Sequence, residues 1–386
     1  MNNTFVVVGG GLAAAHAVAE LRDAGHDGRI VLVGAEPHLP YERPPVSKSY
    51  LIGESDRAAA TVHDEQWYAD HEVELRLGVR AVLVDRIGHR LQTDQGMLHY
   101  EKLLLATGAR PRRLAMADES RADVAYLRSF EDADRIRGAV AAGARVVVIG
   151  GGWIGLEVAS AARRAGCDVT VVERAEWPLL PVLGAEVAEL LAAAHRERGV
   201  QLRLGASIDS IDEAGLVLGD GERVAADLVV VGIGAQPNDE LATGAGLDTD
   251  DGVLVDEHLV TADPDVFAAG DVARAHHPVL GHSLRVEHWD TAIAQGRAAA
   301  RSMLGQEVAY DRMPYFFSDQ HDFGLEYVGH PGPAGYDEVE IEHADGGQPA
   351  FTAWWLRGGR TVAGMHVNRW DEIDRIRERV GAVFAH

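Results

Sequence analysis

The segment Val146-Val147-Val148-Ile149-Gly150-Gly151-Gly152-Trp153-Ile154-Gly155 decides the fold of this chain. Its four β-branched residues predict a buried strand, the three glycines predict a tight turn, and the residues after the turn have the periodicity of a helix. A second segment of the same kind, Phe5-Val6-Val7-Val8-Gly9-Gly10-Gly11-Leu12-Ala13-Ala14, begins close to the first residue. The chain therefore contains one strand–turn–helix unit twice.

Both units continue in the same way. A second strand is expected over residues 29–33 in the first unit and over residues 168–172 in the second. Further on, the segment Leu103-Leu104-Leu105-Ala106-Thr107-Gly108-Ala109-Arg110-Pro111 matches Val229-Val230-Val231-Gly232-Ile233-Gly234-Ala235-Gln236-Pro237. Strands that alternate with helices form parallel βαβ units. The sequence thus predicts an α/β fold with two doubly wound, Rossmann-like nucleotide-binding domains.

The sequence after about Arg312 has a different pattern. Three short apolar segments, at residues 315–317, 353–356 and 361–363, are bounded by Gly and Pro and predict antiparallel strands. A polar helix is expected from Glu372 to Val380. We therefore expect a small α+β C-terminal domain. The expected domains are a first nucleotide-binding domain of residues 1–112 and 240–312, a second of residues 113–239, and a C-terminal domain of residues 313–386.

The composition excludes several classes of protein. The 386 residues are 47% apolar and carry a formal net charge of −24, which argues against nucleic acid and anionic membranes as partners. Cys167 is the one cysteine, so neither an intrachain disulfide nor a dithiol relay can form, and a cytoplasmic location is expected. No apolar run approaches the roughly 18 residues of a membrane helix, and no secretory signal is expected before the first strand. The 18 histidines show no metal-ligand spacing, so no metal site is expected.

The two glycine-rich turns have the pattern of dinucleotide-binding sites. In such a turn the first glycine allows a tight bend, the second lets the backbone approach a pyrophosphate, and the third lets the helix pack closely. The pattern positions are Gly9, Gly11 and Ala14 in the first turn and Gly150, Gly152 and Gly155 in the second. Phosphates then bind at the N-terminus of the helix that follows.

Acidic residues after the second strand of each unit refine the ligands. Glu173 ends that strand in the second unit, where a carboxylate binds a ribose hydroxyl and repels a 2′-phosphate, which favours NADH. The neighbouring Arg174 leaves NADPH open as an alternative. Glu36 is the candidate ribose ligand in the first unit. Two dinucleotide sites suggest a tightly held FAD and an exchangeable NAD(H), because hydride transfer needs a donor and an acceptor face to face.

The motifs together resemble those of the FAD-dependent pyridine nucleotide oxidoreductases, which have a glutathione-reductase-like fold. Within that family the chain is most similar to the ferredoxin reductases that act with putidaredoxin, rubredoxin or the ferredoxin of biphenyl dioxygenase. The motifs follow in family order: residues 9–13, 40–48, 106–108, 150–157, 267–271 and 286–289.

The resemblance implies a role for each matching residue. Lys48 corresponds to a lysine beside the flavin, and Glu157 to the glutamate that pairs with it, so both are expected to be catalytic. The expected FAD-binding residues are Gly9, Gly11, Leu12, Ala13, Ala14, Glu36, Arg43, Lys48, Ala81, Ala106, Thr107, Gly108, Arg128, Gly270, Asp271, Glu287, His288 and Trp289. The expected NAD-binding residues are Gly150, Gly152, Trp153, Ile154, Gly155, Glu157, Glu173, Arg174 and Gly234.

The implied activity is that of an NADH-dependent ferredoxin reductase. Hydride passes from NADH to FAD, and single electrons pass to a two-iron, two-sulfur ferredoxin that feeds a haem monooxygenase or a ring-hydroxylating dioxygenase. Disulfide reductases of the same architecture have a cysteine pair after the first unit, whereas residues 41–51 contain none, so electrons must leave the flavin directly. Arg297, Arg301 and Phe317 are expected to dock the acidic ferredoxin, with Phe317 in place of a tryptophan found in several relatives. A monomer or weak homodimer is expected.

Two other functions share these motifs. The first is reduction by NADH of small acceptors such as quinone or monodehydroascorbate, which needs no ferredoxin. The second is redox sensing of the kind found in apoptosis-inducing factor, in which NADH forms a long-lived complex and changes dimerisation. Turnover with each acceptor distinguishes these alternatives.

Overall fold

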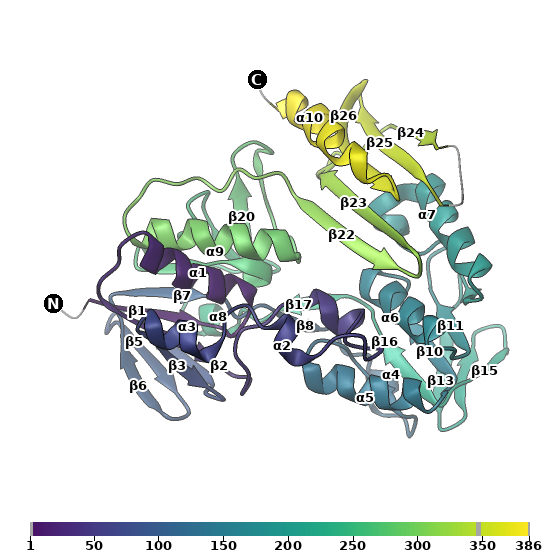
Figure 1. Ribbon diagram of the computed structural model, residues 1–386, viewed down its shortest axis with the longest axis horizontal. Helices are drawn as coiled ribbons and strands as arrows, with labels where there is room; N and C mark the ends of the chain where they lie inside the picture. The colour runs from purple at the N-terminus through teal and green to yellow at the C-terminus, as the bar shows by residue number, and fades with distance from the viewer. Residues whose placement is uncertain (1–2, 345–348, 385–386) are drawn as a thin grey trace. The chain divides into compact units, whose positions relative to one another are not determined.

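The computed structural model of the protein describes residues 3–344 and 349–384 (Figure 1). Contacts divide the chain into two compact units. The first unit comprises Met1–Glu42, Ala60–Arg110 and Gln236–Pro314, and the second comprises Arg43–Ala59, Pro111–Ala235 and Tyr315–His386. The boundaries between the units fall within β8 (Ala109–Pro111) and β17 (Ala235–Pro237), and also after Glu42, Ala59 and Pro314. The division into FAD, NAD and C-terminal domains stays a prediction. The contacts group Arg43–Ala59 with the second glycine-rich turn.

The first unit is built on a five-stranded parallel sheet in the order β19-β7-β1-β2-β3. Its strands are β1 (Thr4–Val8), β2 (Arg29–Gly34), β3 (Val73–Leu77), β7 (Lys102–Leu105) and β19 (Val266–Ala268). Helices α1 (Leu12–Asp23) and α9 (Trp289–Met303) lie side by side on it (Figure 1). A Cβ on Gly296 would lie 2.4 Å from the Ala13 carbonyl oxygen, so this glycine allows the two helices to approach closely.

Two small sheets and short helices complete the first unit. The antiparallel sheet β4-β5-β6 and the sheet β18-β20-β21 each have three strands. Their bounds, with those of the short helices, are β4 (Ala81–Asp85), β5 (Arg90–Thr93), β6 (Gly96–His99), β18 (Val253–Val255), β20 (Ala273–His277), β21 (His282–Leu284), α3 (Glu65–Asp70), α8 (Glu240–Gly244) and η2 (Gly270–Val272).

The second unit repeats the parallel architecture, as the duplicated sequence predicts. Its five-stranded sheet has the order β12-β11-β10-β16-β9. The strands are β9 (Val124–Ala125), β10 (Val146–Ile149), β11 (Val169–Val172), β12 (Gln201–Arg203) and β16 (Leu228–Val231). Around it lie η1 (Pro44–Ser47), α2 (Arg57–Ala60), α4 (Ala115–Asp118), α5 (Phe130–Ala141), α6 (Trp153–Arg164), α7 (Leu180–Glu197), and the meander β13 (Ile208–Asp212), β14 (Gly215–Leu218) and β15 (Arg223–Ala225). The predicted α/β fold class is confirmed.

The C-terminal part of the second unit is an antiparallel sheet in the order β22-β23-β26-β25-β24, covered by α10 (Figure 1). Its elements are β22 (Tyr315–Gln320), β23 (Phe323–Gly329), β24 (Glu338–His343), β25 (Phe351–Arg357), β26 (Arg360–Val367), η3 (Trp370–Glu372) and α10 (Ile373–Phe384). The three apolar segments predicted as antiparallel strands lie in β22, β25 and β26, so this prediction is confirmed. The predicted C-terminal helix is α10.

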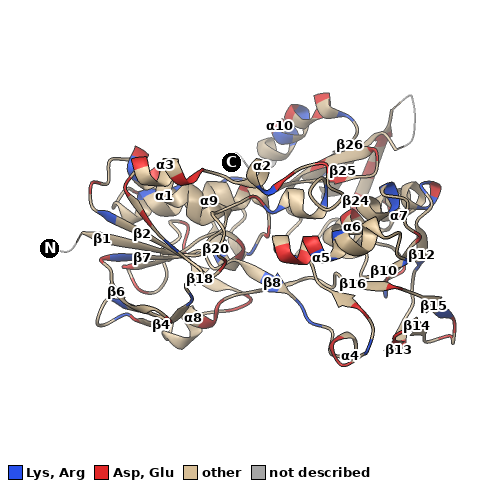
Figure 2. Ribbon diagram, turned by 60° about the horizontal axis from the view of Figure 1, so that its bottom comes forward, with Lys and Arg blue, Asp and Glu red and all other residues tan. Residues whose placement is uncertain are grey.

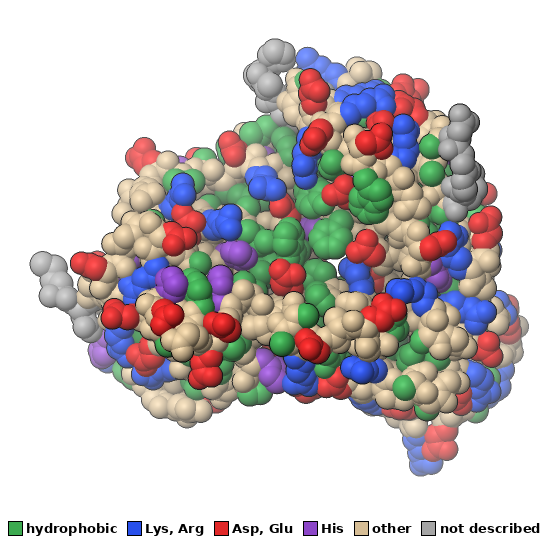
Figure 3. All heavy atoms as spheres, in the orientation of Figure 1, with side chains coloured by type: hydrophobic (Ala, Val, Ile, Leu, Met, Phe, Trp, Pro, Cys, Tyr) green, Lys and Arg blue, Asp and Glu red, His purple; other side chains and the backbone are tan. Residues whose placement is uncertain are grey.

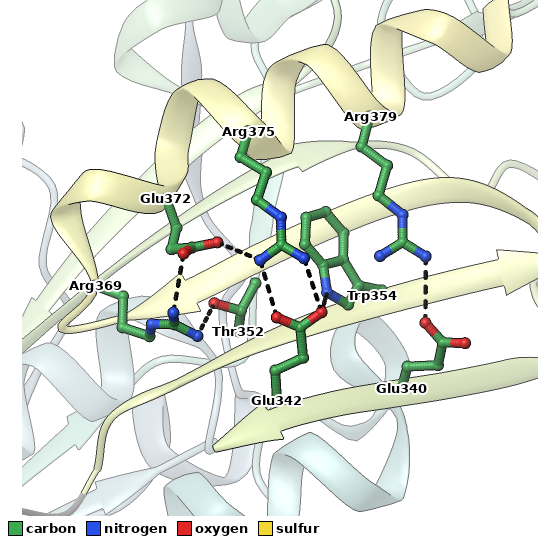
Figure 4. Close-up of polar contacts among 8 residues, drawn as sticks. All are labelled: Glu340, Glu342, Thr352, Trp354, Arg369, Glu372, Arg375 and Arg379. Atoms are coloured by element: carbon green, nitrogen blue, oxygen red, sulfur yellow. Dashed lines mark hydrogen bonds and ion pairs between the residues drawn. The ribbon is translucent and has the colours of Figure 1, made fainter. Parts of the chain in front are cut away.

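Ion pairs attach α10 to this sheet (Figure 4). Arg375 binds Glu342 of β24 at 2.9 Å, and Arg379 binds Glu340 at 3.2 Å. The Trp354 ring lies beneath both guanidinium groups, 5.1 Å from that of Arg375 and 4.2 Å from that of Arg379. A stacked arginine keeps its charge near water while its stem covers apolar surface, so this polar helix packs on an apolar sheet.

Charged side chains of both signs are mixed over the surface. The first turn of α5 is acidic, with Glu131 and Asp132 at the positive end of the helix dipole (Figure 2). Basic side chains gather over α10 with acidic ones beside them (Figure 3). On the face that Figure 3 shows, acidic side chains therefore do not form one continuous field, and a basic patch can act locally.

Candidate active site

The first glycine-rich turn joins β1 to α1. Gly9 has a φ of +136°, and a Cβ on it would lie 2.0 Å from the Ala106 carbonyl oxygen, so the turn requires glycine. Gly11 is the N-cap of α1 and has no side-chain cap. A Cβ on Gly11 would meet no residue beyond its chain neighbours within 4 Å. This open space beside a helix N-terminus suits a pyrophosphate.

The second glycine-rich turn, between β10 and α6, has the same construction. Gly150 has a φ of +106°, and its Cβ would lie 2.4 Å from the Gly232 carbonyl oxygen. A Cβ on Gly155 would lie 2.1 Å from the Gly150 carbonyl oxygen, which is why the helix packs so closely there. Gly152 is different, because its Cβ would meet only the Gly232 oxygen, at 3.9 Å. The three glycines therefore differ in their surroundings, and their roles in binding a dinucleotide stay a prediction.

Glu173 stabilises the second turn through hydrogen bonds. Its carboxylate accepts hydrogen bonds from the backbone N–H of Gly151 at 2.6 Å and of Ala175 at 2.7 Å. Arg174 beside it is exposed and has no ion pair within the ranges that the structure describes. The carboxylate is thus fixed next to the turn, where a ribose hydroxyl can reach it.

The other residues predicted to bind NAD lie close to the same turn. Trp153 and Ile154 begin α6. The Trp153 ring packs edge-on against Phe316, with centroids 4.6 Å apart, while Ile154 is 46% exposed. Gly234 has a φ of +101°, and its carbonyl accepts a hydrogen bond from the Arg112 N–H. An exposed isoleucine beside a phosphate-type turn gives a planar ring an apolar surface on which to pack.

Lys48 and Glu157 form a buried ion pair in the second unit. The Lys48 Nζ lies 3.0 Å from Glu157 Oε1, and the two side chains are 17% and 5% exposed. Lys48 follows η1, which Pro44 begins, and Glu157 lies in the second turn of α6. Because buried charges are costly, such a pair persists only when its remaining polar atoms are also satisfied.

Two serines complete the contacts of the Glu157 carboxylate. Ser47 Oγ donates to Oε2 at 2.5 Å, and Ser318 Oγ donates to Oε1 at 2.6 Å. The Phe317 ring covers Lys48, with its centroid 5.3 Å from Nζ. The structure thus brings together the two predicted catalytic residues and Phe317, whose roles remain predictions.

The residues of the first unit that were predicted to bind FAD have varied surroundings. Glu36 accepts a hydrogen bond from the Tyr41 hydroxyl at 2.7 Å. Thr107 Oγ1 donates to the Asn238 carbonyl at 2.7 Å. Gly270 has a φ of +79° and begins η2 before Asp271, and its N–H donates to Gln295 at 2.9 Å. Leu12, Ala13, Ala14 and Ala106 are buried, whereas Ala81, Gly108, His288 and Trp289 are half-buried.

Three arginines and Glu287 of the predicted sites contact other protein groups. In the second unit, Arg43 donates to the carbonyl oxygen of Arg128 at 2.8 Å. In the first unit, Glu287 binds Arg285, and Arg301 binds Glu20 at 2.5 Å. Of the two predicted docking arginines, Arg301 therefore has its charge paired. Arg297 is exposed and has no ion pair in the described part of the chain.

Five polar residues near Glu157 were not predicted from the sequence: Ser47, His195, Ser318, Gln320 and His321. Ser47 precedes Lys48, so its position beside a catalytic candidate was an available signal. The others come from α7 and from β22 with the turn that follows it, far away in the sequence. The alternation of Ser318 and Gln320 on one face of a strand was the signal for the second pair.

The buried His195 makes folding depend on pH. Burial lowers its pKa to about 4, the hydrogen bond to Gln320 opposes this, and Arg198 lowers it further. The unfolded chain takes up a proton on this residue below about pH 6.5 where the folded chain does not, so His195 alone should lower the free energy of unfolding by about 2 kcal/mol by about pH 5. Urea unfolding at about pH 7 and about pH 5 measures this. His195→Phe should lose less stability on acidification, and an equal loss in both proteins would contradict the assignment.

Other expected features lie apart from this site. Cys167 is buried, its Sγ lies 3.4 Å from the Val140 carbonyl oxygen, and burial raises the pKa of its thiol. Among residues 3–344 and 349–384, no group of three His, Cys, Asp or Glu side chains is arranged to hold a metal ion. Within the same ranges no helix has both the length and the apolar character to span a membrane.

Residues 3–296 match the family model described as pyridine nucleotide-disulphide oxidoreductase. The chain belongs to this family. Residues 315–382 of the oxidoreductase match a second model, described as reductase C-terminal. These matches confirm the predicted family, the class of enzyme and the use of FAD and NAD(H).

Individual relatives cover nearly all of this oxidoreductase. It is 40% identical over 384 residues to the anthranilate 1,2-dioxygenase system ferredoxin–NAD(+) reductase component of Burkholderia cepacia, covering 98% of this chain and 94% of that protein. It is 36% identical to putidaredoxin reductase of Pseudomonas putida, covering 98% and 91%. The solved covalent putidaredoxin reductase–putidaredoxin complex has a TM-score of 0.94 at 35% identity, covering 99% of this chain and 94% of that one.

Proposed function

We propose that this oxidoreductase is an NADH-dependent ferredoxin reductase, whose electrons pass through FAD to a two-iron, two-sulfur ferredoxin that feeds an oxygenase. The observation that carries the proposal is the buried Lys48–Glu157 pair beside Phe317, in the unit that contains the second glycine-rich turn. The names of the relatives, ferredoxin–NAD(+) reductase and putidaredoxin reductase, support the same function. The lack of a cysteine between residues 41 and 51 supports direct electron exit.

The residues of the pair supply electrostatics and position. FAD, when bound, takes up the two electrons of a hydride together and releases them singly. Lys48 supplies a fixed positive charge, which favours the negative charge that hydride transfer brings to the isoalloxazine. Glu157 holds the ammonium group at 3.0 Å, and the two serines hold Glu157. Because the groups are already ordered, little reorganisation is needed during the reaction.

The two turns bind the dinucleotides. Both Gly11 and Gly152 leave space beside a helix N-terminus, so the backbone N–H groups there can donate to phosphate oxygens. The Glu173 carboxylate accepts a hydrogen bond from a ribose hydroxyl and repels a 2′-phosphate. NADH, rather than NADPH, is therefore the expected hydride donor. The exposed Arg174 is the residue that would support NADPH.

The ferredoxin docks at Arg297 in this proposal. An acidic carrier approaching a chain of net charge −24 is repelled at long range, but screening over roughly 8 to 10 Å lets nearby charges dominate. Arg297 is exposed on α9, whereas the charge of Arg301 is paired with Glu20. We therefore assign the larger contribution to Arg297.

Reversing the charge at Arg297 tests the docking. Arg297→Glu should raise the KM for ferredoxin about tenfold, equivalent to about 1.4 kcal/mol, because one attractive charge becomes repulsive. The rate of flavin reduction by NADH should not change. Arg80→Glu is the matched control, since Arg80 is also an exposed arginine of the first unit and, like Arg297, has no ion pair in the described part of the chain. Equal effects of the two variants on KM would contradict a specific docking role.

Turnover with different acceptors tests the proposed function itself. NADH should bleach the yellow protein, and a two-iron ferredoxin should accelerate cytochrome c reduction many-fold. Rapid turnover with quinone or monodehydroascorbate alone, without a response to any ferredoxin, would overturn the proposal in favour of a small-acceptor reductase. Slow turnover with every acceptor, together with NADH-dependent association, would overturn it in favour of a redox sensor.

We also propose that the protein works in the cytoplasm as a monomer or weak homodimer. The cytoplasm holds the NADH that the reaction consumes, and the single buried cysteine suits a reducing compartment. Sedimentation of the holoenzyme with and without NADH tests the oligomeric state.

A further inference from the structure

A chain of hydrogen bonds leads away from the Glu157 carboxylate. Ser318 Oγ lies 2.6 Å from Glu157 Oε1, and Gln320 Nε2 lies 3.0 Å from Ser318 Oγ. Gln320 Oε1 lies 2.8 Å from His195 Nε2, and His195 Nδ1 lies 3.1 Å from His321 Nε2. Three side chains, those of Ser318, Gln320 and His195, thus connect the buried ion pair to His321.

The elements of the second unit hold this chain in place. Ser318 and Gln320 alternate along β22, so both face the same side of the sheet. His195 belongs to the last turn of α7 and has no exposed surface, whereas His321 is partly exposed. The chain therefore runs from a buried carboxylate to the surface of the unit.

The direction of every donor follows from the charge of Glu157. A carboxylate only accepts, so the Ser318 hydroxyl donates to it and can accept only from the amide nitrogen of Gln320. The Gln320 oxygen then faces His195, which must carry its proton on Nε2. The bare Nδ1 of His195 can accept only from a protonated Nε2 on His321. One ionised carboxylate thus fixes the amide orientation and both tautomers.

The backbone at His321 is unusual. His321 and Asp322 form the two-residue turn between β22 and β23, and His321 has a φ of +53°. Two-residue hairpin turns favour this left-handed conformation, and histidine, like Asn and Asp, adopts it more readily than most residues other than glycine. The turn places the His321 ring with its centroid 4.8 Å from that of His195. The turn thus brings the His321 ring to the end of the hydrogen-bond network, where its Nε2 contacts His195 Nδ1.

Charged groups surround the two imidazoles. Arg198, the C-cap residue of α7, lowers the pKa of both rings, while Arg164 of α6 lowers and Asp322 of the turn raises the pKa of His321. Burial, His195 and the arginines lower the pKa of His321 to about 3, against the opposing charge of Asp322. Both rings are therefore neutral at physiological pH, and the hydrogen bonds from Glu157 to His321 require this neutral state.

We infer that His195 and His321 are positioning residues for the Lys48–Glu157 pair. Through Gln320 and Ser318 they fix the hydroxyl that binds Glu157 Oε1, the same oxygen that holds the Lys48 ammonium. A change at the surface of the unit, at His321, therefore reaches the lysine. The inference rests on the proposed function in one respect, the role of Lys48 beside the flavin.

Isotope labelling of the holoenzyme tests the chain directly. The sequence contains only two lysines, Lys48 and Lys102, so ε-carbon-labelled lysine gives two signals, and Lys102 is an internal control. The signal of Lys48 should shift in Ser318→Ala and in His321→Asn, while that of Lys102 should not. Nitrogen-labelled histidine should show His195 and His321 neutral with the proton on Nε2. An unmoved Lys48 signal in both variants, or a proton on Nδ1 of His195, would overturn the inference.

Flavin reduction by NADH supplies a second readout. His321→Asn keeps a residue that tolerates a positive φ and removes the imidazole, so the fold should be retained. We expect it to lower the rate of flavin reduction about fivefold with an unchanged KM for ferredoxin, because only the geometry of Lys48 and Glu157 is disturbed. His89→Asn is the matched control, since His89 also has a positive φ, of +47°, and is, like His321, half-buried in a turn.

These measurements separate two failures. If ferredoxin gives no acceleration but the Lys48 signal shifts as expected, the proposed function is wrong, whereas the positioning role of the two histidines is supported. If turnover with ferredoxin is fast and the Lys48 signal does not move, the function holds and the histidines have no positioning role. His195→Phe extends the test, although its complete burial puts the fold at risk, and for that reason His321→Asn is the deciding variant.

Discussion

Lys48→Met should slow the reduction of bound FAD by NADH about 100-fold, the usual cost of removing one preorganised charge from an active site. Met has a similar length, so the packing against Phe317 is largely kept while the ammonium is lost. The remaining carboxylate of Glu157, buried and without its counter-ion, should add to the loss. Anaerobic stopped-flow absorbance of the flavin measures the rate.

The other lysine is the control for this variant. Lys102 lies on β7 and binds Asp265 at 2.6 Å, so Lys102→Met also breaks an ion pair, but one outside the proposed site. Flavin reduction in Lys102→Met should remain within about twofold of the wild-type rate, because partly exposed pairs contribute little. Near-normal reduction in Lys48→Met would show that the pair is structural and would remove the observation on which the proposed function rests.

Two alanine substitutions in the second glycine-rich turn should affect different properties, one the stability of the protein and the other its affinity for NADH. Gly150→Ala should lower the free energy of unfolding by more than about 3 kcal/mol, because its Cβ would lie 2.4 Å from a backbone oxygen at a φ of +106°. Gly152→Ala should leave the free energy of unfolding nearly unchanged, since its Cβ would meet only one atom, at 3.9 Å. Instead, it should raise the Kd for NADH at least about tenfold by intruding where the pyrophosphate binds.

Thermal unfolding and NADH titration of the two variants measure this contrast. Each variant is the control for the other, because both add one methyl group to the same turn. Unaltered NADH affinity in Gly152→Ala would contradict the placement of the dinucleotide at this helix N-terminus. Comparable loss of stability in both variants would contradict the steric argument.

The sequence was sufficient for features that depend on neighbouring residues. The strand–turn–helix units were predictable because Gly150, Gly152 and Gly155 act within one turn, and a duplicated pattern is far less ambiguous than a single one. The antiparallel strands β22, β25 and β26 were predictable from their apolar residues. The strand β24, Glu338–His343, was missed, although its alternation of charged and apolar residues is typical of an edge strand.

Features that depend on distant residues needed the structure. Lys48 and Glu157 were predicted as a pair only through a family resemblance, since 109 positions separate them in the numbering. The chain from Ser318 to His195 combines a strand and a helix whose relation no local pattern encodes. The different states of Arg297 and Arg301 likewise depend on Glu20 of another helix. Tertiary packing decides which of two similar side chains has a free charge.

An anaerobic titration tests the central claim, that electrons from NADH pass through this protein to ferredoxin. A small, catalytic amount of the holoenzyme is mixed with excess oxidised two-iron ferredoxin. NADH is then added in small portions while the absorbance of the flavin and of the ferredoxin is monitored. Because a hydride carries two electrons and each ferredoxin accepts one, every NADH should reduce two ferredoxins, and Lys48→Met should slow the approach to that ratio without changing it. Flavin that is reduced by NADH while the ferredoxin stays oxidised would contradict the claim.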